Sequence, residues 1–393
     1  MTQAPPAVDP KAIETFAPHW CLFWAESVKV SQFEIWLPYL RRSRYRYAIA
    51  ASGDQFPASV RAHVEAMPNV TLVPAFDQMR PIFRASSAFH GFLYISTKPE
   101  NFAIVNSFGG YMHVWLGHGE SGKAANAFRT ASVYDSVFMA HYDGVRRFPR
   151  AVRRWVGRGA CAIGVPIVEG VTQDPWAFPR PVRTILYAPT WEGYRDSVDY
   201  SSVPEFVPRL VEAMPSLLAD GVKVIVRPHP GTGKRRPEYR PLLDALLDAG
   251  ALRGRTKAED FAEADIMIGD VSGVVGEFLF TQKPTIMPTS ARLATVIPDA
   301  KLRAEYPWVD RWPDDGLDIQ GRLAALASRD PLRGARAAAA RRKFRGHRSL
   351  EEAAVTFDIA LAATRWRKTR IPPRYVFEAA ARVPLLRRPL SWD

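Results

Sequence analysis

The stretch "DIMIGDVSGVVGEFLF", Asp265–Phe280, decides the fold class of this 393-residue chain. Its apolar part, Ile266–Gly269, predicts a short buried β-strand. The residues Asp-Val-Ser-Gly that follow predict a turn, and a helix is expected to start near Ser272. A strand, a turn and a helix in this order form the repeating unit of a parallel α/β sheet.

The same alternation extends in both directions along the chain. The later half contains the apolar runs "RTILYAPT", "VKVIVRPHP" and "KPTIM", with helices expected around 203–218 and 239–249. The first 166 residues contain seven more runs, "HWCLFWA", "RYRYAIAAS", "VTLVPA", "AFHGFLYIS", "YMHVWLG", "SVYDSVFMA" and "CAIGVP". Helical patterns dominate from Leu317 to Trp366. The sequence therefore predicts two successive α/β units with a helical closing segment.

Prolines indicate where the two units separate. A cluster of four, at positions 166, 175, 179 and 181, predicts an interdomain linker. We expect a loose N-terminal arm over 1–18, a first domain over 19–166 and a linker over 167–182. A second domain is expected over 183–345, followed by closing helices and a basic tail over 346–393.

Composition limits the class of protein. Hydrophobic residues make up 47% of the chain, which is enough for a sizeable core. The formal net charge of +13 favours phosphate-rich partners, but sign alone does not choose among nucleic acid, nucleotide and anionic membrane. The two cysteines, Cys21 and Cys161, exclude a disulfide scaffold and a cysteine zinc site, and suit a reducing cytoplasm. We recognise neither a signal peptide nor an 18-residue apolar run.

Four polar clusters each follow a predicted strand. They are His118-Gly119, Pro189-Thr190-Trp191, Arg227-Pro228-His229-Pro230 and Asp270-Val271-Ser272-Gly273. Ligands of open parallel sheets bind at the carboxyl ends of the strands. The sequence therefore predicts that the clusters meet along one groove.

Each cluster allows a functional and a structural interpretation. Ser272 and Gly273 at a helix start suit an anion, although Ser272 also suits a simple N-cap. Two flanking prolines hold His229 rigidly beside Arg227, as phosphate recognition requires, although many histidines beside strands are structural. Trp191 either stacks on a base or covers the edge of the core.

The segment Gly117–Lys123 has the spacing of a phosphate-binding P-loop. Ala124 stands where that loop needs a Ser or Thr, and the segment follows about the fifth run of its unit. We therefore favour the interpretation that His118, on a glycine-flanked turn, projects into a cleft as a general base.

Together the clusters resemble the CDP-glycerol glycerophosphotransferase family. The residues that carry the resemblance are "HGESGK", "ILYAPTWEG", "RPHP" and "DIMIGDVSGVVGEFLFTQKPTIM", in family order over about 112–290. The family pattern is W-H-G-x-P-x-K, L-Y-A-P-T-W, R-x-H-P and a D-Y-S-S segment before K-P-I. This sequence departs from it at Gly117, at Glu120-Ser121-Gly122, at Val271-Ser272-Gly273 and at Glu277.

The resemblance implies a GT-B fold, with two Rossmann-like domains facing across a cleft and C-terminal helices crossing back. It implies transfer of glycerol phosphate from CDP-glycerol to a hydroxyl of a glycan or lipid-linked acceptor, with release of CMP. The first domain would be the acceptor side and the second the donor side. His118 would be the catalytic base, and His229 would be a second catalytic residue that also binds the donor. Gly119 and Lys123 would lie on the acceptor side. The residues that would hold the donor are Thr190, Trp191, Arg227, His229, Asp270, Ser272, Gly273 and Glu277.

Other donors stay open, because the departures concern the identity of the substrates. CDP-ribitol and a UDP-sugar on the same fold are the alternatives. A non-enzymatic basic protein is disfavoured, because it would leave the strand-end clusters without a purpose and no nucleic-acid-binding motif is recognised. We expect no tightly bound cofactor and no divalent metal, since no Asp, Glu or His cluster has metal-ligand spacing.

The C-terminal stretch 365–393 holds eight basic and two acidic residues interleaved with aromatic and apolar ones. Such a stretch suits an anionic membrane surface, and it equally suits a solvated basic terminus. We expect a cytoplasmic protein, and association with the inner face of the plasma membrane stays open.

Overall fold

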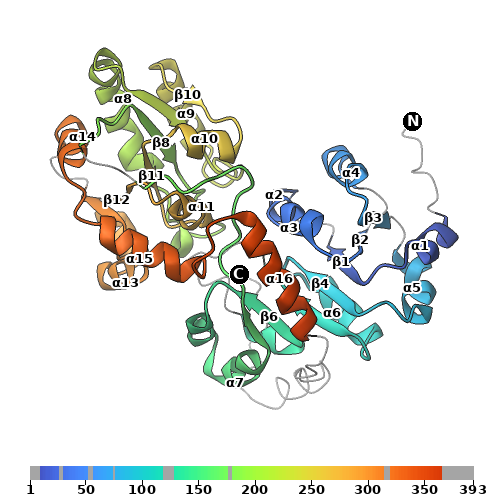
Figure 1. The fold of residues 1–393 in the computed structure, drawn as a ribbon. Helices are drawn as coiled ribbons and strands as arrows, with labels where there is room; N and C mark the ends of the chain where they lie inside the picture. Colours follow the sequence, from blue (N-terminus) through green and yellow to red (C-terminus); the bar gives the residue numbers. More distant parts are fainter. Residues whose placement is uncertain are drawn as a thin grey trace. The chain divides into compact units, whose positions relative to one another are not determined.

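The computed structural model describes residues 9–25, 30–51, 56–73, 76–117, 128–175, 179–313 and 319–364. They form two compact units (Figure 1). The first unit holds the described residues up to Pro166 together with those from Ser349 onward, and the second holds those of Ile167–Arg348.

The first unit contains a seven-stranded sheet in the order β3-β2-β1-β4-β5-β6-β7, and every pair is parallel. All seven apolar runs predicted from the sequence are strands. Their bounds are β1 Trp20–Trp24, β2 Tyr47–Ala51, β3 Val70–Val73, β4 Gly91–Tyr94, β5 Met112–Trp115, β6 Ser136–Met139 and β7 Ala160–Ala162.

Helices of the first unit follow the strands along the chain. They are α1 Pro10–Phe16, α2 Val30–Glu34, α3 Leu37–Arg42, α4 Ala58–Glu65, α5 Phe76–Ala85, α6 Glu100–Ser107 and α7 Arg150–Gly159, with 3₁₀ turns η2 Arg129–Val133 and η3 Tyr142–Arg147. Strands β1, β4 and β5 are buried throughout, as expected of a parallel sheet that is covered on both faces.

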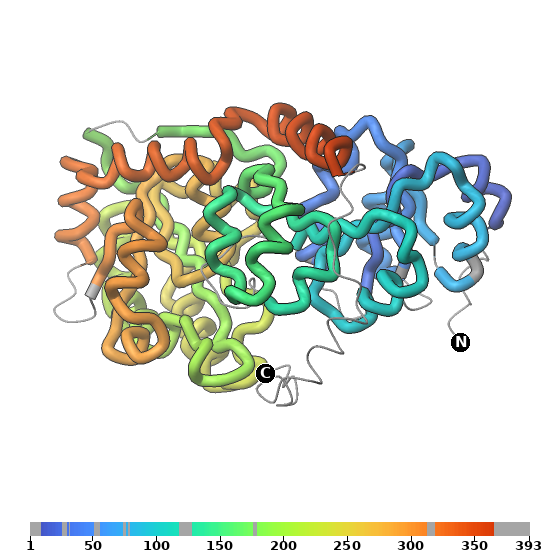
Figure 2. The backbone as a smooth tube through the Cα atoms, turned by 90° about the horizontal axis from the view of Figure 1, so that it is seen from below, coloured from blue at the N-terminus to red at the C-terminus, as the bar shows by residue number. Residues whose placement is uncertain are grey.

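The last described helix, α16 Leu350–Thr364, returns to the first unit. It lies beside α3 (Figure 2). The ring of Phe357 packs 5.7 Å from that of Trp36. The backbone N–H of Arg44 donates to Asp358 Oδ2 over 2.9 Å. The C-terminal crossing that the fold class predicts is confirmed.

The second unit contains a six-stranded parallel sheet in the order β10-β9-β8-β11-β12-β13. The strands are β8 Thr184–Ala188, β9 Lys223–Val226, β10 Leu252–Arg253, β11 Ile266–Gly269, β12 Thr285–Thr289 and β13 Asp310–Pro313. Strands β10 and β13 were not predicted. The first is two exposed residues and the second is largely polar, so neither has an apolar run.

The second unit's helices are α8 Val203–Ala219, α9 Tyr239–Asp248, α10 Lys257–Glu263, α11 Gly273–Phe278, α12 Ala291–Val296, α13 Asp299–Glu305, α14 Ile319–Ser328 and α15 Arg333–Lys343, with 3₁₀ turns η4 Asp196–Val198 and η5 Leu279–Thr281. Apolar residues of α8, α9 and α14 form one core with alternate residues of the sheet. The other face, which includes Leu186, Ile225 and Met267, is also buried, and α10 and α11 contact β8 and β11.

Both sheets reverse their strand order in the same way, between β1 and β4 and between β8 and β11. The predicted class of two Rossmann-like parallel-sheet domains is therefore confirmed. In such sheets the reversal leaves a crevice outside the carboxyl ends of the two central strands. The site should be sought there.

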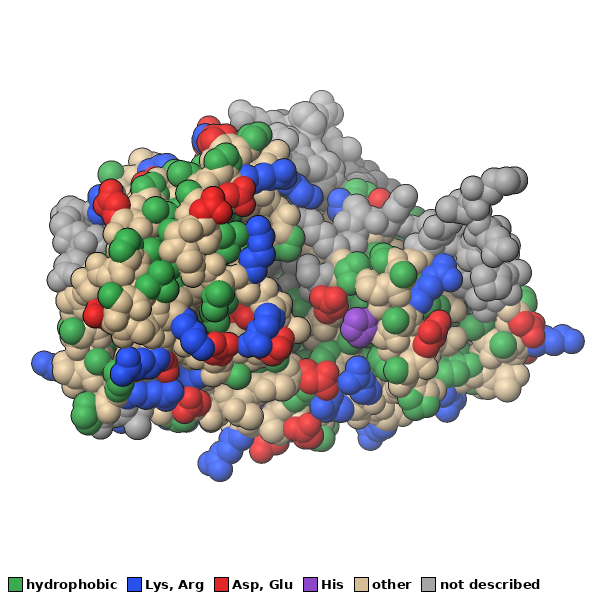
Figure 3. Space-filling view, turned by 90° about the horizontal axis from the view of Figure 1, so that it is seen from above, with side chains coloured by type: hydrophobic (Ala, Val, Ile, Leu, Met, Phe, Trp, Pro, Cys, Tyr) green, Lys and Arg blue, Asp and Glu red, His purple; other side chains and the backbone are tan. Residues whose placement is uncertain are grey.

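The described surface carries mixed charge. On the face in Figure 3, basic and acidic side chains lie next to one another and do not form a field of one sign. Across the described ranges, none of the helices combines the length and the apolar character that a membrane span requires.

Candidate functional site

Three of the four predicted polar clusters meet at the reversal point of the second sheet. The backbone N–H of Thr190, after β8, donates to Asp270 Oδ2, after β11, over 2.8 Å. The N–H of His229, after β9, donates to the Pro189 carbonyl over 3.1 Å. The strands β9, β8 and β11 are neighbours, so these bonds join three adjacent loops at the carboxyl edge.

Asp270 holds this edge together. Asp270 is only 1% exposed, and its Oδ2 also accepts the Ser202 N–H over 3.1 Å. A buried carboxylate is tolerated where several N–H groups donate to it. Asp270 therefore fixes the loop after β8 and the start of α8, a role that the sequence did not predict for it.

Ser272 occupies the N-cap position of α11, yet its side chain makes no capping hydrogen bond. The residue is 7% exposed, and its Oγ has no hydrogen-bond partner among the described residues. The simple N-cap interpretation thus does not account for this hydroxyl. A Cβ added to Gly273 would have nothing within 4 Å, so there is open space beside it.

His229 and Trp191 form a stacked pair, with ring centroids 5.7 Å apart and an interplanar angle of 16°. The Gly231 N–H donates to His229 Nδ1 over 2.9 Å, so the neutral ring carries its hydrogen on Nε2. A Cβ on Gly231 would lie 3.1 Å from both His229 Nδ1 and the Trp191 ring. The close approach of the backbone to these two rings therefore favours glycine there.

Arg227 and Glu277 are tied by ion pairs. Arg227 Nε donates to the buried Asp260 Oδ2 over 2.5 Å, and its Nη2 donates to the Arg255 carbonyl over 2.6 Å. Glu277 accepts from Lys257 Nζ over 2.9 Å. The sequence analysis missed Asp260, because nothing in its helical context distinguishes it from a surface carboxylate.

Glu192 is a second residue that the sequence analysis missed. It is fully buried, and it accepts the backbone N–H groups of Gly233, Arg235 and Arg236. Burial raises the pKa of its carboxyl group, but the backbone N–H of Glu192 itself and these three N–H donors together bring the pKa below its ordinary value. An acidic residue inside the strand-end segment "LYAPTWEG" was the signal that could have identified it.

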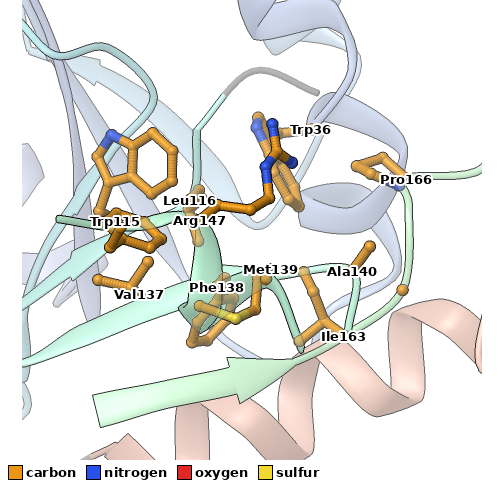
Figure 4. Close-up of a pocket in the computed structure, with 13 residues that line it drawn as sticks. Trp36, Trp115, Leu116, Val137, Phe138, Met139, Ala140, Arg147, Ile163 and Pro166 are labelled. Carbon is orange, nitrogen blue, oxygen red and sulfur yellow. The ribbon is translucent and has the colours of Figure 1, made fainter. Parts of the chain in front are cut away.

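The catalytic base and the acceptor-side residues predicted from the sequence, His118, Gly119 and Lys123, lie outside the described residues. The strand that precedes them, β5, ends at an open pocket of about 50 Å³ in the first unit (Figure 4). Its lining is mainly apolar and includes Leu116, Phe138 and Ile163, with Arg147 among the rings. Trp36 Nε1 donates to the Gly117 carbonyl over 2.8 Å, which fixes the chain just before His118.

No group of three or more His, Cys, Asp or Glu side chains arranged to hold a metal ion is found within the described ranges.

Solved structures with the same fold confirm the class of protein that the two sheets define. A single-residue variant of the wall teichoic acid polymerase TagF matches at 14% identity and TM-score 0.51, over 90% of this chain and 91% of that chain. An enzyme described as a UDP-N-acetylglucosamine 2-epimerase from Listeria monocytogenes matches at 13% identity and TM-score 0.52, over 88% and 96%. Anabaena HepE in complex with UDP and glucose matches at 10% identity and TM-score 0.50, over 88% of this chain and 99% of that chain. The chain thus has the two-domain GT-B fold.

A sequence comparison shows which family the second unit resembles. Residues 174–290 match the model of the CDP-glycerol:poly(glycerophosphate) glycerophosphotransferases, and this range contains the loops after β8, β9 and β11. This segment is similar to that family, and the match indicates a transferase. None of the curated proteins matches the chain.

Proposed function

We propose that the protein transfers glycerol phosphate from CDP-glycerol to a hydroxyl group of a glycan or lipid-linked acceptor and releases CMP. One observation carries this proposal. The strand-end loops within the family segment meet at the reversal point of the second sheet, and the buried hydroxyl of Ser272 lies there without a partner among the described residues.

The second unit would bind the donor. In this proposal Ser272 and Gly273 hold the diphosphate, and His229 donates to it from Nε2, the ring nitrogen opposite the one that Gly231 fixes. Trp191 and Thr190 line the same edge. Arg227 and Glu277 act through their ion pairs, Arg227 by fixing the loop after β9 against Asp260 and Glu277 by holding Lys257.

The first unit would bind the acceptor. The acceptor oxygen attacks the phosphorus that bears glycerol, and the bond from this phosphorus to the oxygen of CMP breaks. His118 takes the proton of the attacking hydroxyl. The products are a phosphodiester between acceptor and glycerol and free CMP, to which His229 donates a hydrogen bond from Nε2. Such a transfer depends on positioning and charge neutralisation more than on covalent chemistry.

A binding screen of the full chain tests the donor. We expect calorimetry to detect CDP-glycerol and to give weaker or no binding for CDP-ribitol and UDP-glucose. The alternative is a glycosyltransferase that uses another activated donor, because the Anabaena protein of the same fold is a complex with UDP and glucose. Binding of UDP-glucose without binding of CDP-glycerol would replace the proposal with this alternative.

The proposal includes a peripheral location on the inner face of the plasma membrane. Its support is the basic, aromatic stretch 365–393, which lies outside the described residues. Sedimentation with phosphatidylglycerol vesicles should carry down the full chain and leave a chain that ends at Thr364 in solution. Equal sedimentation of both chains would remove this part of the proposal.

A further inference from the structure

The loop after β8 contains a carboxylate whose position is unusual for a strand-end turn. Glu192 is fully buried. Its Oε2 accepts the Gly233 N–H over 3.1 Å, and its Oε1 accepts the N–H groups of Arg235 and Arg236 over 2.7 and 3.1 Å. One side chain thus satisfies three backbone donors of a turn that begins about 40 residues later, an arrangement that fixes the turn.

Arg235, from the same turn, also fixes the loop after β8. Arg235 Nη2 donates to the Glu192 carbonyl and Arg235 Nε to the Gly193 carbonyl, both over 3.0 Å. Gly193 and Gly233 have φ angles of 65° and 75°, which favour glycine. The two loops therefore lock to each other through side chain and backbone together, and each depends on the other for its conformation.

The loop after β9, which includes this turn, carries two groups at the edge where we propose that the donor binds. The Gly231 N–H donates to His229 Nδ1, and the Thr232 N–H donates to the His229 carbonyl over 2.8 Å. Thr232 is only 8% exposed, and its hydroxyl has no hydrogen-bond partner among the described residues. A second buried hydroxyl without a partner, besides that of Ser272, thus lies on a loop of the same edge.

Charge balance does not explain Glu192. The guanidinium groups of Arg235 and Arg236 reach carboxylates elsewhere, at Asp196 over 2.8 Å in both cases and at Asp199 over 3.6 and 3.3 Å. The Glu192 carboxylate instead accepts hydrogen bonds from backbone N–H groups. Its role is to set the path of the main chain through the turn.

We propose that Glu192 is the positioning residue of the donor site. Its carboxylate sets the Gly231–Arg236 turn, so that His229 keeps its ring orientation and the Thr232 hydroxyl lies ready to bond a donor oxygen. This inference rests on the proposed function of the site. It adds two residues, Glu192 and Thr232, to those that the sequence predicted.

Two substitutions at Glu192 and a matched control test the proposal. Glu192→Gln keeps the shape but offers one acceptor oxygen in place of two, and Glu192→Ala removes both. Asp265→Asn is the control, because Asp265 is also buried and accepts two backbone N–H groups, of Arg183 and Thr184, at the opposite edge of the same sheet. We expect Glu192→Gln to weaken CDP-glycerol binding about 10-fold, because a tenfold change corresponds to the loss of about one hydrogen bond. Glu192→Ala should weaken binding further, because it removes both acceptor oxygens. We expect Asp265→Asn to lower stability with donor affinity within about 2-fold of wild type.

Coupling to His229 separates positioning from a general structural role. If Glu192 acts through the turn, Glu192→Gln combined with His229→Ala should weaken binding less than the product of the single effects. Thr232→Val should weaken binding and should add nothing to Glu192→Ala. Full additivity of Glu192→Gln with His229→Ala, or equal donor affinity of the Gln variant and wild type, would overturn the proposal.

A measurement without ligand keeps this proposal separate from the proposed function. The nitrogen chemical shifts of His229, read by NMR on the full chain, report which ring nitrogen carries the hydrogen. We expect Glu192→Gln to move these shifts and the Gly231 amide resonance, and Asp265→Asn to leave both in place. Unmoved shifts in the Gln variant overturn the inference whether or not CDP-glycerol binds, whereas moved shifts in a protein that fails to bind CDP-glycerol overturn only the proposed donor.

Discussion

The carboxyl edges of the two sheets have the same topology and different chemistry. In the first unit the strands β5, β6 and β7 end at a pocket whose walls are mainly apolar and aromatic, with Trp36 and Trp115 among them. In the second unit the loops after β8, β9 and β11 are polar and are fixed by buried carboxylates, those of Glu192, Asp260 and Asp270.

The difference shows how one fold can serve two kinds of ligand group. A buried carboxylate is costly unless donors surround it, so each of these three carboxylates has a set of N–H partners that fixes a loop. A fixed polar edge suits a charged ligand, because its dipoles need not reorganise when the ligand binds. Aromatic walls suit apolar groups and impose less directional order.

The largest effect is expected from loss of the proposed catalytic base. Replacing His118 with Ala should lower turnover roughly 10²- to 10⁴-fold, the range for loss of a general base. CMP release measures turnover, and donor affinity should stay unchanged. His141→Ala is a matched control, since His141 follows the neighbouring strand β6 and pairs with Asp143 over 3.2 Å. Similar losses in both variants would deny His118 its specific role.

Loss of a buried carboxylate at the carboxyl edge of the second unit's sheet should lower the stability of the protein. Asp270→Ala leaves the N–H groups of Thr190 and Ser202 without their carboxylate. We expect the free energy of unfolding to fall by about 2–4 kcal/mol, because a buried donor without a partner costs about 1–3 kcal/mol. Chemical denaturation measures it. Asp299→Asn, which alters an exposed ion-paired carboxylate, should leave the free energy of unfolding nearly unchanged. An equal loss in that variant would refute the special role of Asp270.

In contrast to Asp270, Ser272 should contribute to donor binding and not to stability. Because its hydroxyl has no partner among the described residues, Ser272→Ala should leave the free energy of unfolding unchanged or slightly higher. Donor affinity should fall about 10-fold, as for one lost hydrogen bond to a charged group. A loss of stability together with unchanged affinity would return Ser272 to a purely structural role.

The smallest effect concerns pH. The folded-state pKa of Glu192 lies below its ordinary value of 4.5, so its stabilising contribution is complete above that pH and is lost as pH falls through the folded pKa. The difference in free energy of unfolding between wild type and Glu192→Gln should therefore be constant near neutrality and shrink below about pH 4.5. Denaturation curves over pH 3.5–7 measure it, and a difference that grows with acidity would contradict the assignment.

Local pattern accounts for most of the fold. The apolar runs at β1, β8 and β11 predicted strands because short apolar runs bounded by turn residues are typical of strands that are buried on both faces. Strands β10 and β13 were not predicted, because they are strands through backbone pairing with β9 and β12 and not through an apolar pattern of their own side chains. The polar clusters at Thr190, His229 and Ser272 were predictable, because polar residues directly after buried strands fall at the carboxyl edge.

By itself the sequence determined the two parallel-sheet units, the family segment and which loops carry the polar side chains. The tertiary structure alone decided which backbone groups each carboxylate would meet. Glu192 is separated from Gly233 by about 40 residues and Asp270 from Thr190 by 80, and only the folded sheet brings them within hydrogen-bond distance. The physical reason is that the net contribution of a hydrogen bond depends on the burial and geometry of both partners, and neither is encoded in the residues next to them along the chain.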